Sequence, residues 1–150
     1  MTIATEDVPW PYETYNAARI QVISAATMTE AALLARVMHL CRLYGLLYYH
    51  THDSRGSQPG FPDLVIVSPD GDGQTVLFRE LKVNGGRLTF EQKRWGRALR
   101  AAGEDYGVWT PEDYATRRIT CELAAISPLA AMGQLPVPPD MQQLTLDEAA

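Results

Sequence analysis

Three charged residues lie where the core of a β-sheet would normally contain aliphatic side chains. Asp63 stands within the apolar run from Phe61 to Val67, and Glu80 and Lys82 lie inside a second run from Thr75 to Val83. Burying a charge costs free energy unless the charge is paired or bound to a metal ion. Because perturbed charges concentrate where chemistry occurs, these residues are the first candidates for a functional site.

The spacing of these residues indicates how they would meet. Side chains two apart on a strand share a face, so Glu80 and Lys82 point the same way and Leu81 faces the opposite layer. If the two runs pair as a hairpin, Asp63 lies beside Glu80, and the two carboxylates form a hard oxygen site for Mg²⁺ or Mn²⁺. The Leu81 carbonyl would add a ligand, and Lys82 would stand beside an activated water attacking a phosphodiester. Alternatively, Glu80 and Lys82 face solvent and Asp63 only caps a strand.

The hydrophobic pattern predicts the elements that position this site. Strands are expected from Leu46 to His50 and from Asp105 to Thr110. Each of the two apolar runs is expected to form a strand, and a turn at Pro69 to Gly73 would connect them. Helices are expected from about Thr27 to Tyr44, from Thr89 to Gly103 and from Pro111 to Arg118, with a further short element at residues 119–126. This order predicts an α/β fold with a small mixed β-sheet flanked by helices.

The helix expected from Thr89 to Gly103 has two distinct faces. Its predicted buried face consists of Gln92, Trp95, Leu99 and Ala102, and Lys93, Arg97 and Arg100 line the opposite side. Residues 79–100 contain seven Lys or Arg against two Glu, a net charge of +5 in a chain of net charge −5. A local basic segment is typical of phosphate binding, although a solvated helix face would have the same composition.

Composition and cysteine content limit the class of protein. The 150 residues predict one domain, with an N-terminal arm at 1–26 and an acidic, proline-containing tail at 128–150 that is expected to be poorly ordered. No apolar run is long enough to span a membrane, and the N-terminus does not resemble a signal peptide. Cys41 and Cys121 are expected to be reduced core residues, which predicts a cytoplasmic protein.

The order of several motifs resembles one group of nucleases. Pro62-Asp63, followed after sixteen residues by Glu80-Leu81-Lys82, is similar to the PD-(D/E)xK nuclease superfamily, whose core is restriction-endonuclease-like. The wider stretch, at about residues 28–118, resembles the VRR-NUC domain. The shared features are Glu30 on the first helix, Tyr49-His50, Ser54-Arg55, and the segments GFPDLVIV, FRELKV, LTFEQKRW and AAGEDYGVWTPEDY. Residues 27–127 are therefore expected to form a VRR-NUC nuclease domain.

The resemblance implies a role for individual residues. Asp63 and Glu80 match the metal ligands of the family, and Lys82 matches the lysine that orients or deprotonates the attacking water. Glu30 matches an acid on the first helix that helps to hold the water shell of the metal. Gln92 matches a glutamine beside the site at the start of the next helix.

Two of these residues have a competing structural interpretation. Thr27 precedes Glu30 by three residues, and Thr89 precedes Gln92 by three, so each pair could be a helix capping box. Glu30 shares the core-facing stripe of its helix, which favours a buried position. For Gln92 the catalytic and capping roles remain equally open.

Basic residues near the expected site are candidates for contacts with DNA. Arg55, in the loop before Pro62-Asp63, would clamp a phosphate with its guanidinium, or would be a solvated loop residue. His50 and His52 are expected to be structural or surface residues, since neither has the spacing of a zinc site. The further candidates for gripping the DNA backbone are Arg87, Lys93, Arg94, Arg97 and Arg100.

Together the residues and the resemblance predict an Mg²⁺- or Mn²⁺-dependent endodeoxyribonuclease. The resemblance to stand-alone viral and bacterial proteins implies a homodimer that cuts branched DNA such as four-way (Holliday) junctions, in a bacterial or virus-infected cell. One alternative is a nuclease acting on linear duplex or flap DNA in repair or restriction. Another is a DNA-binding module without cleavage, and a third is an interaction protein that binds a partner through its acidic tail.

Overall fold

Four strands form a mixed sheet in a computed structural model that describes residues 26–69 and 75–136. The strands are β1 (Leu47–His50), β2 (Leu64–Val67), β3 (Val76–Leu81) and β4 (Asp105–Trp109), and they lie in the order β1-β2-β3-β4. β1, β2 and β3 pair antiparallel, whereas β4 pairs parallel with β3. The predicted α/β fold with a small mixed sheet is confirmed, and so is the hairpin of β2 and β3.

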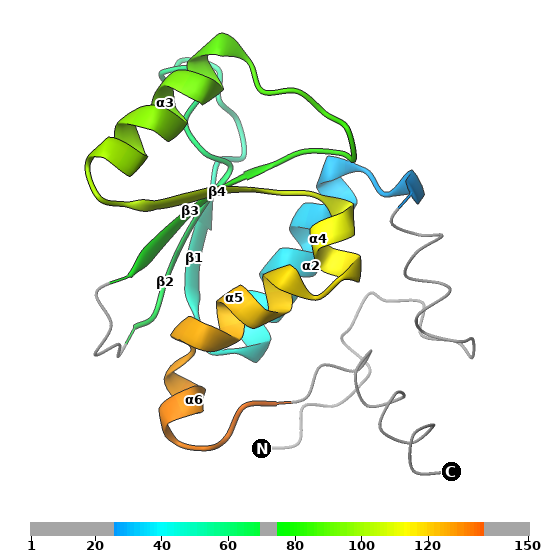
Figure 1. Cartoon of the computed structure of the whole chain (residues 1–150), viewed down its shortest axis with the longest axis vertical. Helices are drawn as coiled ribbons and strands as arrows, with labels where there is room; N and C mark the ends of the chain where they lie inside the picture. The colour runs from blue at the N-terminus through cyan, green and yellow to red at the C-terminus, as the bar shows by residue number, and fades with distance from the viewer. Residues whose placement is uncertain (1–25, 70–74, 137–150) are drawn as a thin grey trace.

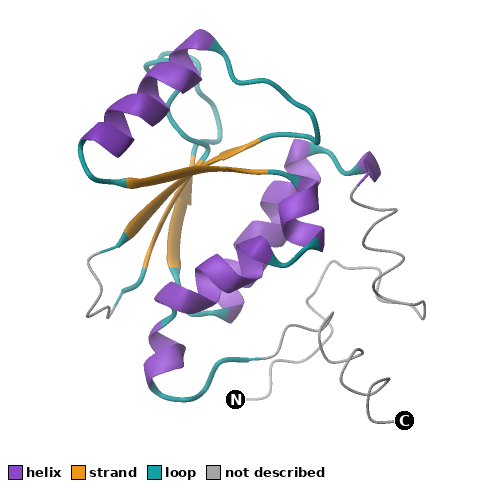
Figure 2. Cartoon of the chain, in the orientation of Figure 1, coloured by secondary structure: helices purple, strands orange, loops and turns teal. Residues whose placement is uncertain are grey.

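Helices cover the two faces of the sheet unequally (Figures 1 and 2). α2 (Glu30–Leu43), α4 (Pro111–Ala115) and α5 (Arg118–Ile126) lie on one side, and α3 (Phe90–Ala101) lies on the other side against β4. Because α3 links the parallel strands β3 and β4, it is the crossover helix of a β-α-β unit. Within the described ranges, no helix is long and apolar enough to cross a bilayer.

α2 begins at Glu30 because Thr29 caps its first turn, accepting a hydrogen bond from the Ala32 amide at 3.1 Å. Just beyond its end, Gly45 has a φ of 67°, a conformation that favours glycine. The competing interpretation of Thr27 and Glu30 as a capping box is therefore wrong, because the helix starts closer to Glu30 than predicted. The buried face of α2 consists of Leu33, Val37, Leu40 and Cys41.

Alternate residues of the central strands face α2 and build the core. Leu64 and Ile66 of β2 and Leu77 and Leu81 of β3 are each at most 2% exposed, and they belong to the same cluster as the buried face of α2. Removing apolar surface from water stabilises the fold by about 25 cal/mol per Å². The same strand alternation turns Val65 of β2 and Phe78 and Glu80 of β3 to the α3 side.

α3 approaches the sheet through a residue without a side chain. A Cβ placed on Gly96 would lie 2.5 Å from the Cε1 atom of Tyr106 in β4, so the helix backbone lies directly over the Tyr106 ring. Trp95 and Leu99 are half-buried, in agreement with the predicted buried face, but Ala102 is exposed. The prediction is wrong at Ala102 because the contact with the sheet is centred on Gly96.

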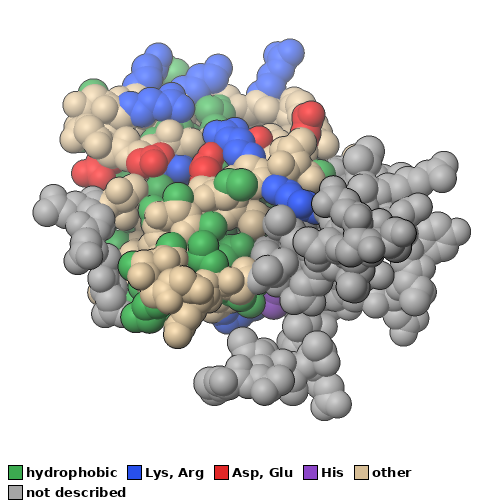
Figure 3. Space-filling model, turned by 60° about the horizontal axis from the view of Figure 1, so that its bottom comes forward, with side chains coloured by type: hydrophobic (Ala, Val, Ile, Leu, Met, Phe, Trp, Pro, Cys, Tyr) green, Lys and Arg blue, Asp and Glu red, His purple; other side chains and the backbone are tan. Residues whose placement is uncertain are grey.

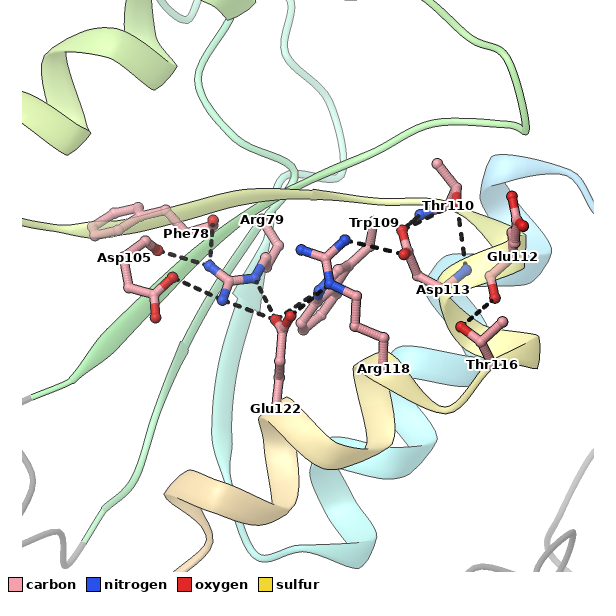
Figure 4. Close-up of polar contacts among 10 residues, drawn as sticks. All are labelled: Phe78, Arg79, Asp105, Trp109, Thr110, Glu112, Asp113, Thr116, Arg118 and Glu122. Atoms are coloured by element: carbon pink, nitrogen blue, oxygen red, sulfur yellow. Dashed lines mark hydrogen bonds and ion pairs between the residues drawn. The ribbon is translucent and has the colours of Figure 1, made fainter.

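Arg79 is buried on the α5 side of the sheet and joins β3 to β4 and α5 (Figure 4). Its guanidinium forms ion pairs with Asp105 at 2.8 Å and Glu122 at 3.0 Å. It also packs over the Trp109 ring at 5.0 Å, and the Trp109 indole donates a hydrogen bond to Glu122 at 2.9 Å. A buried guanidinium requires such partners, so this network fixes α5 against the parallel strand pair.

The chain continues past α5 as a short helix, α6 (Pro128–Ala131). Ser127 anchors it, because the Ser127 hydroxyl donates a hydrogen bond to the Tyr44 carbonyl at 2.7 Å and accepts one from the Leu129 amide at 3.2 Å. The prediction of a poorly ordered tail from Pro128 is wrong for this helix, since serine and proline supply its N-cap and first residue. Most of the expected arm, turn and tail falls on 1–25, 70–74 and 137–150, outside the described residues.

The two cysteines have different environments, and neither is in a disulfide. Cys41 is buried in α2, where burial raises the pKa of its thiol to about 12. Cys121 is exposed on α5. The prediction of two reduced core residues is therefore right about Cys41 and wrong about the burial of Cys121, because part of α5 faces solvent.

Candidate active site

Asp63 is held at the entry to β2 by a contact across the hairpin. Its Oδ2 atom accepts a hydrogen bond from the backbone amide of Leu81 at 2.7 Å. Leu64, the next residue, pairs with Arg79 in the antiparallel register, which brings the start of β2 level with the end of β3. The hairpin thus places Asp63 beside Glu80, and each carboxylate affects the ionisation of the other.

Glu80 is the buried centre of the cluster, with only 1% of the residue exposed. Its Oε1 atom accepts hydrogen bonds from Lys82 Nζ at 2.8 Å and from the side-chain amide of Gln92. Among the described residues, no donor reaches the other oxygen, Oε2, although that atom is also buried. A buried carboxylate oxygen without a partner is costly, which indicates a ligand position.

Burial makes the two carboxylates unusually basic. It is the main cause that raises the pKa of Glu80 to about 7, and the negative charge of Asp63 raises it further against the opposing effect of Lys82. Burial also raises the pKa of Asp63, although the hydrogen bond from Leu81 and the charge of Lys82 oppose the rise. The pair therefore resists full ionisation near neutral pH unless positive charge is added beside it.

Lys82 directly follows β3 and supplies part of that positive charge. Its Nζ atom lies 2.8 Å from Glu80 Oε1 and 3.9 Å from Glu30 Oε1. Burial alone lowers the pKa of Lys82, but the hydrogen bond from its ammonium to Glu80 and the nearby carboxylates raise it above the ordinary value. Lys82 is therefore an ammonium ion at neutral pH and acts as a hydrogen-bond donor.

Glu30 reaches the cluster from the first turn of α2. Its side chain is 48% exposed, so the expected buried position is wrong, because Glu30 stands at the solvent-facing end of the helix. Its distance of 3.9 Å from Lys82 nevertheless brings it into the same electrostatic cluster as Asp63 and Glu80. The sequence motifs at four separate places in the chain thus converge at one end of the sheet.

Gln92 serves the helix cap and the cluster at the same time. Its side-chain carbonyl accepts a hydrogen bond from the Thr89 amide at 2.8 Å, and the Thr89 hydroxyl accepts one from the Gln92 amide at 3.2 Å. This confirms the capping box predicted for these two residues. The Gln92 side-chain nitrogen remains available and donates to Glu80. The two interpretations of Gln92 are therefore compatible.

The donor set fits a small, hard divalent cation. Glu80 Oε2 is buried without a partner in the described structure, and the Asp63 carboxylate lies beside it. Within the described ranges no three His, Cys, Asp or Glu side chains form a cage for a metal ion. Two carboxylates completed by water suit Mg²⁺ or Mn²⁺, which retain several waters in proteins. The Leu81 side chain is buried in the opposite layer as predicted, and the role of its carbonyl stays a prediction.

The basic candidates lie outside this cluster. Arg55 pairs with Asp53 at 2.6 Å on an exposed loop, so a phosphate would have to compete with that carboxylate. The sequence interpretation did not consider Asp53. Lys and Arg side chains gather along the upper edge of the view in Figure 3. The exposed basic residues that follow β3 or lie on α3 are Arg87, Lys93, Arg94, Arg97 and Arg100.

Tyr106 is a residue near the site that the sequence did not single out. Its hydroxyl is buried without a hydrogen-bond partner among the described residues, and the Arg100 guanidinium lies 5.0 Å from the centre of its ring. Burial raises the pKa of Tyr106, and the charge of Glu80 adds to the rise. Only the parallel pairing of β4 with β3 brings Tyr106 close to Glu80, and no local pattern in the sequence encodes that pairing.

Comparison with known proteins identifies a protein family that the chain matches. The chain matches the family model described as the VRR-NUC domain over residues 9–111. No curated protein matches the sequence significantly. A similar solved structure is that of Hjc, a Holliday junction resolvase from the archaeal hyperthermophile Archaeoglobus fulgidus, with 22% sequence identity and a TM-score of 0.35. The alignment covers 54% of the present chain and 63% of the length of that protein.

Proposed function

The chain belongs to the VRR-NUC family of the PD-(D/E)xK nuclease superfamily, and from this premise we propose that it is a divalent-metal-dependent endonuclease acting on branched DNA. The observation that carries the proposal is the buried Glu80 carboxylate with one unpartnered oxygen, flanked by Asp63 and Lys82. A buried carboxylate oxygen without a donor requires an explanation, and a bound cation with its water shell would supply one.

The residues of the cluster have distinct proposed roles. Asp63 and Glu80 hold the cation, which supplies a Lewis acid and an activated water when bound. Lys82 orients the attacking water and stabilises the negative charge that develops on the phosphodiester, since it is an ammonium ion within the cluster. Gln92 fixes the orientation of the Glu80 carboxylate, and Glu30 helps to hold the water shell and the Lys82 ammonium.

The exposed basic residues support DNA as the substrate. Guanidinium and ammonium groups grip phosphates without reading bases, so binding would depend on the shape of the DNA backbone more than on its sequence. Branched DNA is proposed because the motifs of the chain resemble those of the VRR-NUC domain, for which the resemblance implies such a substrate. The basic residues proposed to contact the backbone are Arg55, Arg87, Lys93, Arg94, Arg97 and Arg100.

A homodimer is part of the proposal. In the described residues β1 is an edge strand of the sheet, and the free backbone groups of an edge strand can pair with those of another chain. Two copies related by a two-fold axis would present two sites to the two strands of a junction. Light scattering at micromolar concentration measures the mass directly, and a monomer at that concentration would argue against paired cuts.

A cleavage panel tests the function. Four-way junction, flap, splayed-arm and linear duplex DNA are each incubated with Mg²⁺, with Mn²⁺ and with excess EDTA. We expect cleavage with either cation, none in EDTA, and at least about tenfold faster cleavage of the junction than of the duplex. Equal rates on the duplex would favour the repair or restriction alternative. Binding without cleavage under every condition would favour a non-catalytic module.

A further inference from the structure

A cavity of about 630 Å³ opens beside the carboxylate cluster. It lies between the loop that follows β1 and the first turns of α3, and Asp63 and Gln92 both contribute to its wall. Its size is within the range of about 300–1,000 Å³ that is usual for small-molecule sites. Its position next to Asp63 means that a group bound in it would be adjacent to the reacting phosphodiester.

Three aromatic residues, Tyr49, Phe61 and Trp95, form part of the wall. Phe61 packs edge-on against Trp95 with ring centroids 5.1 Å apart. The Tyr49 residue is 63% exposed and Phe61 is 37% exposed, so their rings are accessible to a ligand. Exposed rings beside a cavity are suited to stacking, which is worth about 1–3 kcal/mol for each nucleic-acid base.

Trp95 and the loop beside it are held in place before any ligand binds. The Trp95 indole donates a hydrogen bond to the Pro59 carbonyl at 3.1 Å, which ties the loop to α3. Gly60 has a φ of 84°, and a Cβ there would lie 2.5 Å from the backbone carbon of Glu91, so the loop backbone lies directly against the helix. Because this part of the wall is already ordered, a ligand would lose little free energy in arranging it.

The chemistry of the lining favours a base over a phosphate. The described residues that line the cavity include no lysine or arginine, and His52 contributes the one imidazole among them. Neutral polar side chains, among them Thr51, Ser57 and Gln58, offer hydrogen bonds to the edge of a planar heterocycle. A base inside a duplex already has both faces stacked, so only an unpaired base could use these rings.

We propose that this cavity binds the base of an unpaired nucleotide adjacent to the phosphodiester that the carboxylate cluster hydrolyses. The proposal rests on the proposed nuclease function and adds the feature of the DNA that the site selects. Flaps and splayed arms contain unpaired bases, and opening of one base pair at the centre of a four-way junction would expose one there, whereas the bases inside a linear duplex stay paired. The cavity therefore provides selectivity for DNA structure at the site of cleavage, independently of the basic residues that bind the backbone.

Equilibrium binding in Ca²⁺ tests the proposal. The measurement is a double-mutant cycle in which an aromatic residue of the protein and a base of the DNA are each removed, alone and together. The first DNA is a three-way junction of fully paired arms with one unpaired thymidine at its branch, and the second carries an abasic residue at that place. We expect Tyr49→Leu to weaken binding of the first DNA by about tenfold, within the range for loss of one stacked base. It should have little effect on the abasic DNA, because the ring then has nothing to stack on. Phe61→Leu should behave in the same way.

Phe90→Leu is the matched control, because Phe90 is an aromatic residue that is 68% exposed on α3 and does not line the cavity. It should leave the difference between the two DNAs unchanged. If Tyr49→Leu and Phe61→Leu instead weaken binding of both DNAs equally, or weaken neither, the base-binding role is wrong. Circular dichroism confirms that each variant is folded.

The outcomes separate this proposal from the nuclease function. If the chain cleaves junctions, but the loss of binding caused by Tyr49→Leu is the same with and without the unpaired base, the proposed nuclease function stands and the base-binding role is wrong. If Tyr49→Leu weakens binding only of the DNA that has the unpaired base, but no metal ion supports cleavage, the base-binding role stands and the proposed nuclease function is wrong. Failure of the folded wild-type chain to bind either DNA would reject both.

Discussion

The side-chain amide of Gln92 donates a hydrogen bond to the buried carboxylate of Glu80, while its carbonyl caps the helix that carries it. One side chain thus links the position of α3 to the orientation of a proposed metal ligand. A disturbance of the helix start would be transmitted to the site through this single residue.

Replacing Gln92 separates its two roles. Gln92→Ala removes the bond to Glu80 and half of the capping box, whereas Thr89→Ala removes a capping hydroxyl and leaves the bond to Glu80 intact. Each variant should lose about 1 kcal/mol in the free energy of unfolding. Only Gln92→Ala should lower kcat, by about tenfold or more. Equal kcat values for the two variants would show that Gln92 acts through the helix cap alone.

Stability without divalent cations should fall as the pH rises. The pKa of Glu80 rises from 4.5 to about 7 on folding, so between these values the folded chain binds more protons than the unfolded chain. The free energy of unfolding should therefore decrease across this interval, by up to about 3 kcal/mol. Urea unfolding in EDTA at about pH 5 and about pH 8 measures the change. Glu80→Gln should lose most of it.

Mg²⁺ should counteract this loss of stability. A cation competes with protons for the two carboxylates, so the rise in Tm on adding Mg²⁺ should be larger at about pH 8 than at about pH 5. The rise should be absent in Glu80→Gln and preserved in Cys121→Ser, which alters an exposed thiol on the far side of the fold. A rise that persists in Glu80→Gln would place the cation elsewhere.

Lys82 and Lys93 should affect different steps of the reaction. Lys82→Met removes the ammonium from the cluster, so the cleavage rate at saturating DNA should fall by at least about 100-fold, while junction binding in Ca²⁺ changes little. Lys93→Met should weaken binding and reduce the dependence of log K on log salt concentration by about one, with little effect on the rate at saturation. A parallel loss of binding in Lys82→Met would identify Lys82 as a DNA contact.

The network on the other face of the sheet should affect stability. Glu122→Ala leaves the buried Arg79 guanidinium with fewer partners and removes the acceptor of the Trp109 indole. We expect the free energy of unfolding to fall by about 2–4 kcal/mol. Glu112→Ala provides the control, because this exposed residue of α4 lies outside the network. A similar loss in both variants would mean that the network contributes little.

Much of the fold could be predicted because its signals are local. The alternation in the runs around Asp63 and Glu80 defined the hairpin, and the helical spacing of Leu33, Val37 and Cys41 defined α2. The spacing of Asp63, Glu80 and Lys82 on that hairpin was sufficient to predict their convergence. Each of these predictions required only a strand or helix period and one short turn.

The remaining features depend on contacts between distant segments. The contact of α3 through Gly96 with Tyr106 follows from the parallel pairing of β4, which no local period specifies. The pairing of Asp53 with Arg55 likewise depends on the conformation of a loop. The partners of Arg79 lie 26 and 43 residues away along the chain, so sequence proximity gives no indication of them.

The neighbouring residues Arg79 and Glu80 point to opposite sides of β3, one into the ion-pair network and the other into the cluster beside α3. Inserting or deleting one residue between Leu77 and Arg79 would shift the register and exchange the two layers. The guanidinium would then displace the proposed metal ligand, and the acid would meet Glu122. A change of one residue in the length of β3 should therefore be far more damaging than a substitution on either side of the strand, because it disrupts both layers at once.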